Sequence, residues 1–306
     1  SKATKSLSFE IGKQAFAYCV SLETVTLPES VYVDYNIIGE YAFSYCEKLS
    51  DITVGEKFAT VEQGAFAYCT SLSSIALSPK QKVIEAGTFY HCDKLTNVTF
   101  SDEIRSINQS AFANTGISNL DLSRYTKLRS IGSSAFEKTK LSTVTLPDSV
   151  TYIGNRAFFN CYDLVSVEIP FIGNTLVETP NASSFTSIYG MVSRQTDSDR
   201  PNPPSLPENP DNNDEDEPTI RPERTMSVTV KAVTKIPARL FSGCDYLTSL
   251  NVQSYVTPGT YFVYDVNTAD DPELDEERFD GITHREIEIE YDDIDKTVND
   301  SAFANC

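Results

Sequence analysis

A nine-residue motif recurs nine times along this 306-residue chain. Each copy has Ile or Val at its first position, usually Ala at its fifth, Phe at its sixth, and Cys or Thr at its ninth. The copies begin at Ile11, Ile38, Val61, Ile84, Ile107, Ile131, Ile153, Ile236 and Val298. From Ile11 to Ile153, successive copies start 22 to 27 residues apart. A unit of this length cannot bury its own apolar face, so the copies must stack into a solenoid around one continuous core.

An apolar triplet follows each of the first eight copies and predicts one short strand per turn. In the first turn we expect Val25 and Leu27 to face the core and Thr24 and Thr26 to face solvent, because side chains alternate along a strand. The Ile, Ala and Phe of the motif are spaced to fit one short helical turn against the sheet. The phenylalanines of successive turns should then form a stacked column.

The repeat period is typical of leucine-rich repeat solenoids. The sequence therefore predicts a coil of the α/β type, with a parallel β-sheet on the concave face and short helical turns and loops on the convex side.

The charge of the chain is concentrated in two segments that lack the motif. The formal net charge is −19, of which residues 171–225 carry −6 and residues 253–300 carry −12. We predict a solenoid of about seven repeats at 1–170, a mobile Pro/Asp/Glu-rich insertion at 171–225 and a further repeat at 226–252. An acidic insertion at 253–297 contains two alternating stretches that predict a hairpin or a sheet extension. Residues 298–306 begin a last repeat.

The pattern IGxxAFxxCxxLxxVxLPxSV resembles the BspA-like bacterial leucine-rich repeat, also called the Treponema-pallidum-type repeat. The resemblance covers residues 1–170, 226–252 and the last nine residues, and the two acidic insertions depart from the family pattern. It implies a right-handed solenoid in a secreted or cell-surface protein that acts in adhesion or protein recognition. Residues 1–9 lack the layout of a signal peptide. Because the chain begins with Ser and the resemblance implies export, we expect that a leader has been removed. The chain ends partway through a repeat, which leaves open either a truncated chain or further repeats beyond it.

All seven cysteines occupy the ninth position of the motif, and threonine takes the same position in two copies. A position that accepts only Cys or Thr favours a small buried group that hydrogen-bonds a neighbouring backbone. We therefore predict a structural ladder of reduced thiols and hydroxyls, in preference to disulfides or a metal site, formed by Cys19, Cys46, Cys69, Cys92, Thr115, Thr139, Cys161, Cys244 and Cys306.

The sequence offers little for catalysis, and we expect neither an enzyme nor a cofactor or metal. His91 is adjacent to Cys92, which is a poor geometry for a nucleophile and its base, and His284 lies in the second acidic segment. We expect His91 on the convex rim, where Tyr18, Tyr45 and Tyr68 occupy the same motif position. The acidic runs 211–217 and 270–280 lack the glycine turn and terminal Glu of an EF-hand loop.

The sequence also disfavours a nucleic-acid partner and a transmembrane segment. The net charge and the absence of a dense Lys/Arg cluster argue against a nucleic acid. No apolar run is long enough for a transmembrane segment.

The default contact surface of such a solenoid is the row of exposed strand side chains. The predicted concave-face contacts are small and polar, namely Thr24, Thr26, Asp51, Thr53, Asn97, Thr99, Asn119, Asp121, Thr143, Thr145 and Glu168. The second insertion offers Tyr255, Tyr261 and Tyr264 as alternative contacts. We expect recognition of an extracellular or cell-surface protein or of a glycan. A structural spacer that displays other domains, or a glycan-binding surface module without a specific protein partner, is the alternative.

Overall fold

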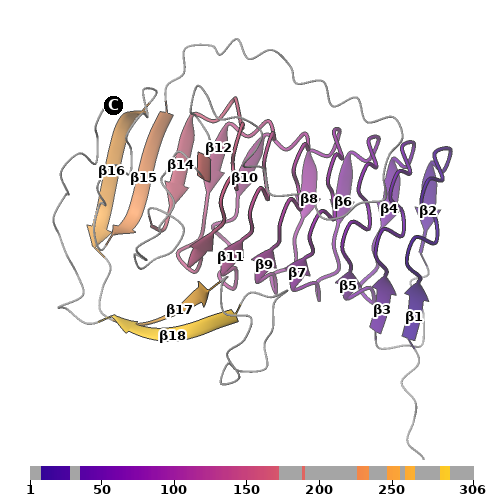
Figure 1. Ribbon diagram of the computed structural model, residues 1–306, viewed down its shortest axis with the longest axis horizontal. Helices are drawn as coiled ribbons and strands as arrows, with labels where there is room; N and C mark the ends of the chain where they lie inside the picture. The colour runs from indigo at the N-terminus through magenta and orange to yellow at the C-terminus, as the bar shows by residue number, and fades with distance from the viewer. Residues whose placement is uncertain are drawn as a thin grey trace, which may run out of the picture.

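The computed structural model describes residues 8–27, 35–171, 188–189, 226–233, 247–255, 259–265 and 283–289. Within these residues the chain coils into stacked turns, and each complete turn contributes one short strand to each of two rows (Figure 1). The stacked turns confirm the prediction of a parallel β-solenoid.

The first row contains the strands that the apolar triplets predict. Its members are β2 (Thr24–Thr26), β4 (Asp51–Thr53), β6 (Ser74–Ala76), β8 (Asn97–Thr99), β10 (Asn119–Asp121), β12 (Thr143–Thr145), β14 (Ser166–Ile169), β15 (Met226–Val233) and β16 (Leu247–Tyr255). Consecutive strands pair in parallel as β2-β4, β6-β8 and β10-β12-β14-β15-β16. Residues at the same position of each repeat are register partners, as in Thr143 opposite Ser166 and Thr145 opposite Glu168.

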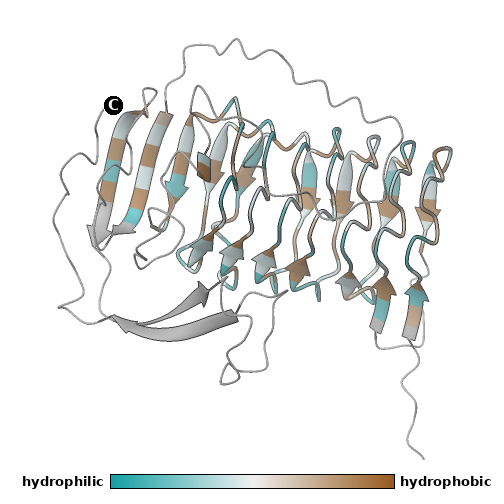
Figure 2. Ribbon diagram, viewed as in Figure 1, coloured by the Kyte–Doolittle hydropathy of each residue, from teal (hydrophilic) through white to brown (hydrophobic). Residues whose placement is uncertain are grey.

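Side chains alternate along these strands as the triplets predict. In β4, β6 and β10 the central residue is buried and its two neighbours are exposed. Figure 2 shows the same alternation of apolar and polar residues along the first row. The central residues Ile52, Ile75 and Leu120 are each at most 4% exposed, because they point into the space between the two rows.

A second row of parallel strands runs along the other side of the core, and the sequence analysis did not predict it. The strands are β1 (Ser8–Ile11), β3 (Tyr35–Ile38), β5 (Thr60–Val61), β7 (Val83–Ile84), β9 (Ser106–Ile107), β11 (Ser130–Ile131) and β13 (Tyr152–Ile153). They pair as β1-β3-β5 and β13-β11-β9-β7. Each strand ends at the first residue of the motif, and the side chain of that residue faces the core.

In the copies from Ile11 to Ile153 the motif forms turns, and the predicted helical turn is wrong there; Ile188 and Tyr189 are the only helical residues in the described part of the chain. Residues 8–27 and 35–171 contain no helix. The fourth and eighth motif positions have positive φ in every described repeat, for example Gln14 at 56° and Tyr18 at 61°. Left-handed residues at this spacing interrupt a right-handed helix. The positive φ at the fourth position matches the third residue of a type II turn, here Gly12 to Ala15.

Backbone hydrogen bonds show why the turn is preferred over a helix. The N–H groups of Gln14, Phe16 and Tyr18 donate to carbonyl oxygens of the next turn at 2.8 Å. The N–H groups of the residues between them donate three residues back within their own turn. This alternation repeats up the stack and links each turn to the next, which a helix could not do because its N–H groups would be used internally.

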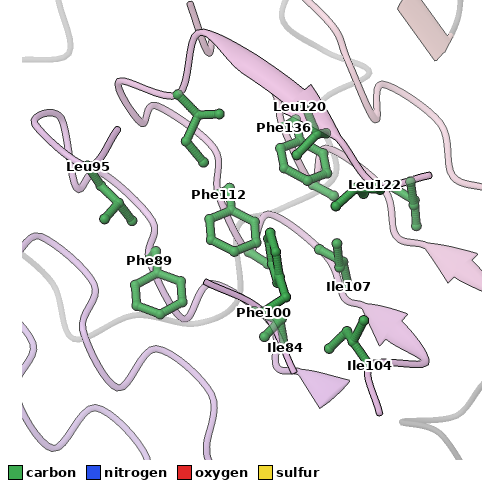
Figure 3. Close-up of a cluster of buried hydrophobic side chains, with 14 of the residues drawn as sticks. Ile84, Phe89, Leu95, Phe100, Ile104, Ile107, Phe112, Leu120, Leu122 and Phe136 are labelled. Carbon is green, nitrogen blue, oxygen red and sulfur yellow. The ribbon is translucent and has the colours of Figure 1, made fainter. Parts of the chain in front are cut away.

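The motif phenylalanines form one buried column. Phe43, Phe66, Phe89, Phe112, Phe136 and Phe158 are fully buried. Neighbouring rings stack with centroids 5.2–5.7 Å apart. Figure 3 shows Phe89, Phe112 and Phe136 in succession, with Leu95 on one side of the column and Ile84, Ile104 and Ile107 on the other.

The column continues into the segment predicted as the first insertion. Tyr189 stacks on Phe158 at 5.4 Å, and the N–H of Phe158 donates to the carbonyl oxygen of Ile188 at 3.0 Å. Ile188 and Tyr189 therefore occupy the fifth and sixth motif positions of another turn. The first-row strand β15 follows and pairs with β14, so the solenoid extends beyond residue 170.

The second predicted insertion contains strands where alternation predicts them. β17 (Gly259–Asp265) and β18 (Thr283–Ile289) pair antiparallel, with Gly259 opposite Ile289. The rest of the predicted insertions and all of 298–306 lie outside the described residues, so the domain boundaries there stay predictions.

Candidate functional site: an exposed strand face

The solvent-facing side chains of the first row form a single surface, which we call the strand face. It contains two columns, one from the first and one from the third residue of each strand from β2 to β14. Register pairs connect the columns from turn to turn, as in Thr24 with Asp51 and Thr26 with Thr53. All eleven predicted face residues lie on it, from Thr24 in β2 to Glu168 in β14.

The face is polar and open over most of its length. Both columns are exposed in β2, β4, β6, β8 and β10, and are partly covered in β12 and β14. Among the described residues, the side chains of Asp51, Thr53, Thr99 and Asn119 make no hydrogen bond or ion pair with another group. Their donors and acceptors are therefore available to a partner.

The backbone beneath the face holds these groups at fixed intervals. Neighbouring strands of a sheet lie about 4.8 Å apart, so equivalent side chains repeat at that distance along the stack. The buried central residues and the column of phenylalanines prevent a strand from rotating without opening the core. The face is therefore a preorganised array.

Carboxylates gather around one lysine at the β14 end of the face. Lys231 on β15 lies 3.1 Å from Asp148 and 3.4 Å from Glu168, and its Nζ also donates to the carbonyl oxygen of Leu146 at 3.0 Å. Hydrogen bonds from Ser123 lower the pKa of Asp121, and the charge of Lys231 lowers it further. The early turns of the face thus carry one separate carboxylate, Asp51, whereas the later turns carry opposite charges in contact. The contribution of Lys231 was not predicted, because its partners are distant in sequence.

A comparison with known protein families identifies the repeat. The model described as "BspA type Leucine rich repeat region" matches residues 9–128 and 122–190. The chain belongs to this family. The second match reaches Ile188 and Tyr189, in agreement with their place in the phenylalanine column.

Several solved structures resemble this BspA-type solenoid, and no curated protein matches its sequence. A Treponema pallidum leucine-rich repeat protein is 18% identical with a TM-score of 0.39, and the similarity covers 83% of this chain and 81% of that one. A leucine-rich repeat protein from Bacteroides ovatus is 18% identical with a TM-score of 0.39, covering 81% and 78%. A leucine-rich cell surface protein from Faecalibacterium prausnitzii is 17% identical with a TM-score of 0.33, covering 80% and 78%.

The ninth position of the BspA-type repeat lies inside the solenoid. Cys46, Cys69 and Cys92 are fully buried, Cys161 is buried, and Cys19 in the first turn is exposed. All five are free thiols in the structure. Burial raises the pKa of Cys46 to about 11 and also raises the pKa of Cys69 and Cys92, so these thiols are poor nucleophiles. Cys244 and Cys306 lie outside the described residues.

The eighth position carries an aromatic stack next to the cysteines. Tyr18, Tyr45 and Tyr68 lie face to face with centroids 4.7 and 4.3 Å apart, and His91 continues the stack 4.9 Å from Tyr68. His91 Nδ1 is 3.7 Å from a carboxylate oxygen of Asp93. Because the rings cover one another's faces, the interior of the stack offers no platform for a sugar ring.

The predicted insertion contacts lie on β16 and β17. Tyr255 is the last residue of β16, while Tyr261 and Tyr264 are register partners of Ile287 and His284 on β18.

Two other classes of feature are absent from the described ranges. These residues hold no cluster of three or more His, Cys, Asp or Glu side chains placed to bind a metal ion. They also include no helix with the length and apolar character needed to cross a bilayer. The acidic runs 211–217 and 270–280 lie outside these ranges.

Proposed function

We propose that this BspA-type solenoid is a non-enzymatic recognition module of a bacterial cell surface or secreted protein, and that it binds a protein or glycan partner through its strand face. The observation that carries the proposal is the row of exposed side chains with unused hydrogen-bonding groups on a rigid sheet. A partner can pair with such groups without first ordering them, which reduces the entropic cost of association.

The chemistry of the face limits the partner. The predicted contacts are mostly Thr, Asn and Asp, and they include no Trp, Tyr or Arg, the residues that dominate tight protein interfaces. A partner would therefore bind through many modest hydrogen bonds spread over several turns. An extended polypeptide or a hydroxyl-rich glycan suits a long polar surface better than a compact apolar protein does.

The test is a binding screen against immobilised extracellular-matrix proteins and a glycan panel. A face variant, Thr53→Arg with Asn119→Arg, places two long cationic side chains on separate strands of the face. A matched control, Thr53→Ser with Asn119→Ser, keeps small polar groups at the same positions. We expect a partner that is retained by the control and lost by the face variant. A partner retained by both would exclude the strand face as its site.

A spacer that displays other domains is the second candidate. The abundance of Thr on the strand face also favours this candidate, because Thr is common at exposed strand positions for conformational reasons alone. The spacer function predicts that the wild-type chain selects no partner in the screen at physiological salt. A second variant, with 193–224 and 253–297 replaced by short linkers, tests whether any partner instead depends on the segments that contain Tyr261 and Tyr264.

A further inference from the structure

Stacking gathers basic residues that are far apart in the sequence. Lys82, Arg105 and Arg129 directly precede the second-row strands β7, β9 and β11. The N–H of Arg105 donates to the carbonyl oxygen of Lys82 at 2.7 Å, and the N–H of Arg129 donates to that of Arg105 at 2.8 Å. The three residues therefore lie one turn apart in a single column. The sequence analysis missed this cluster because its members are separated by 23 and 24 residues.

A second column runs beside the first, two residues earlier in each turn. It holds Lys80, Glu103 and Lys127, and Lys127 Nζ lies 2.5 Å from Glu103. A hydrogen bond from Lys127 lowers the pKa of Glu103, and the charges of Arg105 and Lys82 contribute to the lowering. One carboxylate thus interacts with cations of three turns. We call the five cations the basic ridge: Lys80, Lys82, Arg105, Lys127 and Arg129.

The ridge keeps a positive excess in contact with solvent. Lys80, Lys82 and Lys127 are exposed, and Arg105 and Arg129 are partly exposed. Glu103 is the one carboxylate within the two columns over these three turns, and the neighbouring Asp102 is 2.8 Å from Arg124. The rest of the chain is strongly acidic, so the ridge is a local inversion of the charge of the molecule.

We propose that the basic ridge binds a short segment of a sulfated polysaccharide. Sulfate groups carried densely on a flexible chain can meet the cations of the first column, which repeat about every 4.8 Å, and the two lysines of the second column, which lie two turns apart. The five cations span only three turns of the solenoid, so the recognised segment is short. This site is separate from the strand face and does not depend on the function proposed for it.

A nucleic acid fits the ridge less well. Single strands gain much of their affinity by stacking bases on aromatic side chains, and the aromatic residue beside Arg124, Tyr125, is only 7% exposed. A DNA duplex is stiff over lengths far greater than the ridge and cannot bend to follow it. A flexible glycan can turn away after a few residues.

The test measures binding of a size-defined heparin oligosaccharide by calorimetry at about 0.15 M salt, close to physiological ionic strength. The ridge variant combines Lys80→Ala, Lys82→Ala and Lys127→Ala. The control combines Lys48→Ala, Lys94→Ala and Lys140→Ala, three lysines that are also exposed but lie elsewhere on the solenoid. Both variants change the net charge equally, and thermal unfolding verifies that both fold.

We expect about tenfold weaker binding in the ridge variant, since each exposed ion pair contributes modestly, and binding within about twofold of wild type in the control. Desulfated oligosaccharide should not bind, and a DNA duplex should bind more weakly than heparin. No binding by the wild-type chain, an equal loss in both variants, or preferential binding of DNA would each overturn the proposal.

Discussion

The thiol of Cys69 donates a hydrogen bond to the backbone carbonyl oxygen of Phe43, one turn earlier, at 3.2 Å. Cys46, Cys92 and Cys161 make the same contact with the phenylalanine of their preceding turns. Thr115 and Thr139 instead donate to the phenylalanine of their own turn at 2.9 Å. The ninth position therefore offers two acceptors, which explains why a thiol and a hydroxyl can both occupy it.

Cys69→Thr should be tolerated because the threonine hydroxyl can reach the carbonyl oxygen of its own Phe66. We expect the free energy of unfolding to change by less than about 1 kcal/mol. Cys69→Leu, which adds volume to a filled site, should cost about 1–3 kcal/mol. Urea unfolding followed by circular dichroism measures both changes. An equal cost for the two variants would show that the site does not discriminate by size and hydrogen bonding.

Stability should fall at alkaline pH because the folded chain holds thiol protons that the unfolded chain releases. Burial raises the pKa of Cys46 to about 11 and raises that of Cys69 and Cys92, whereas an unfolded thiol titrates near about 8.5. The stabilising contribution is therefore complete below about pH 8.5 and is lost as the pH rises toward about 11. Unfolding at a series of pH values measures the slope.

A variant with Thr at Cys46, Cys69 and Cys92 should lose less stability over the same pH interval. Some slope should persist, since burial also raises the pKa of Tyr41 and Tyr152. Identical slopes in the variant and the wild type would contradict a role for the thiols.

The sequence was sufficient to predict the parts of the fold that depend on which residues are apolar. Strands such as β4 and the phenylalanine column were predictable because buried positions select apolar residues, which therefore recur at regular intervals in the sequence. The left-handed turns were not predictable, since residues as different as Tyr18, Ser134 and Lys138 occupy them and only Gly64 and Gly87 signal the backbone. The second row was not predicted because most of its strands have only two residues, which show almost no alternation of apolar and polar residues.

Some parts of the candidate site were likewise predictable from the sequence and others were not. The strand face was predicted because its residues alternate with the buried residues along each strand. The ridge and the Lys231 cluster were not, because their members meet only through stacking. Tyr189 was missed because it replaces the phenylalanine that marks the motif.

Each phenylalanine of the column should stabilise the fold in proportion to the burial of its side chain. Phe66 is fully buried between the rings of Phe43 and Phe89, so Phe66→Ala should leave a cavity and cost about 3–5 kcal/mol. Phe16 begins the column and is 42% exposed. We expect Phe16→Ala to cost less than half as much in the same denaturant titration. Equal costs would mean that the column does not act through cavity formation.

Glycine at the second motif position is required only where turns approach closely. A Cβ at Gly154 would lie 2.6 Å from the carbonyl carbon of Gly132 and would also clash with the backbone nitrogen of Ser133. A Cβ at Gly12 would have no atom within 4 Å. Gly154→Ala should therefore lower the unfolding temperature clearly, and Gly12→Ala should leave it nearly unchanged. A matched drop in both would contradict a steric clash at Gly154 as the cause.

A buried ion pair joins the seventh motif position of one turn to the fourth position of the next, where several other turns have small residues. Arg156 Nη2 lies 2.9 Å from Glu137 Oε1, with side chains only 10% and 5% exposed, and the guanidinium carbon lies 3.7 Å from the centroid of the Phe159 ring. Glu137→Gln should cost about 3–5 kcal/mol, because it leaves the arginine charge buried without its counterion. The double variant Glu137→Ala with Arg156→Gly reproduces the small pair at the equivalent positions, Ala67 and Gly87.

The double variant should recover much of that loss, because it removes both charges and also relieves the positive φ of Arg156. In a double-mutant cycle with Glu137→Ala and Arg156→Gly as the single variants, we expect a coupling energy of at least about 1 kcal/mol. Additive single effects would show that the two side chains are stabilised independently and that the close contact contributes little.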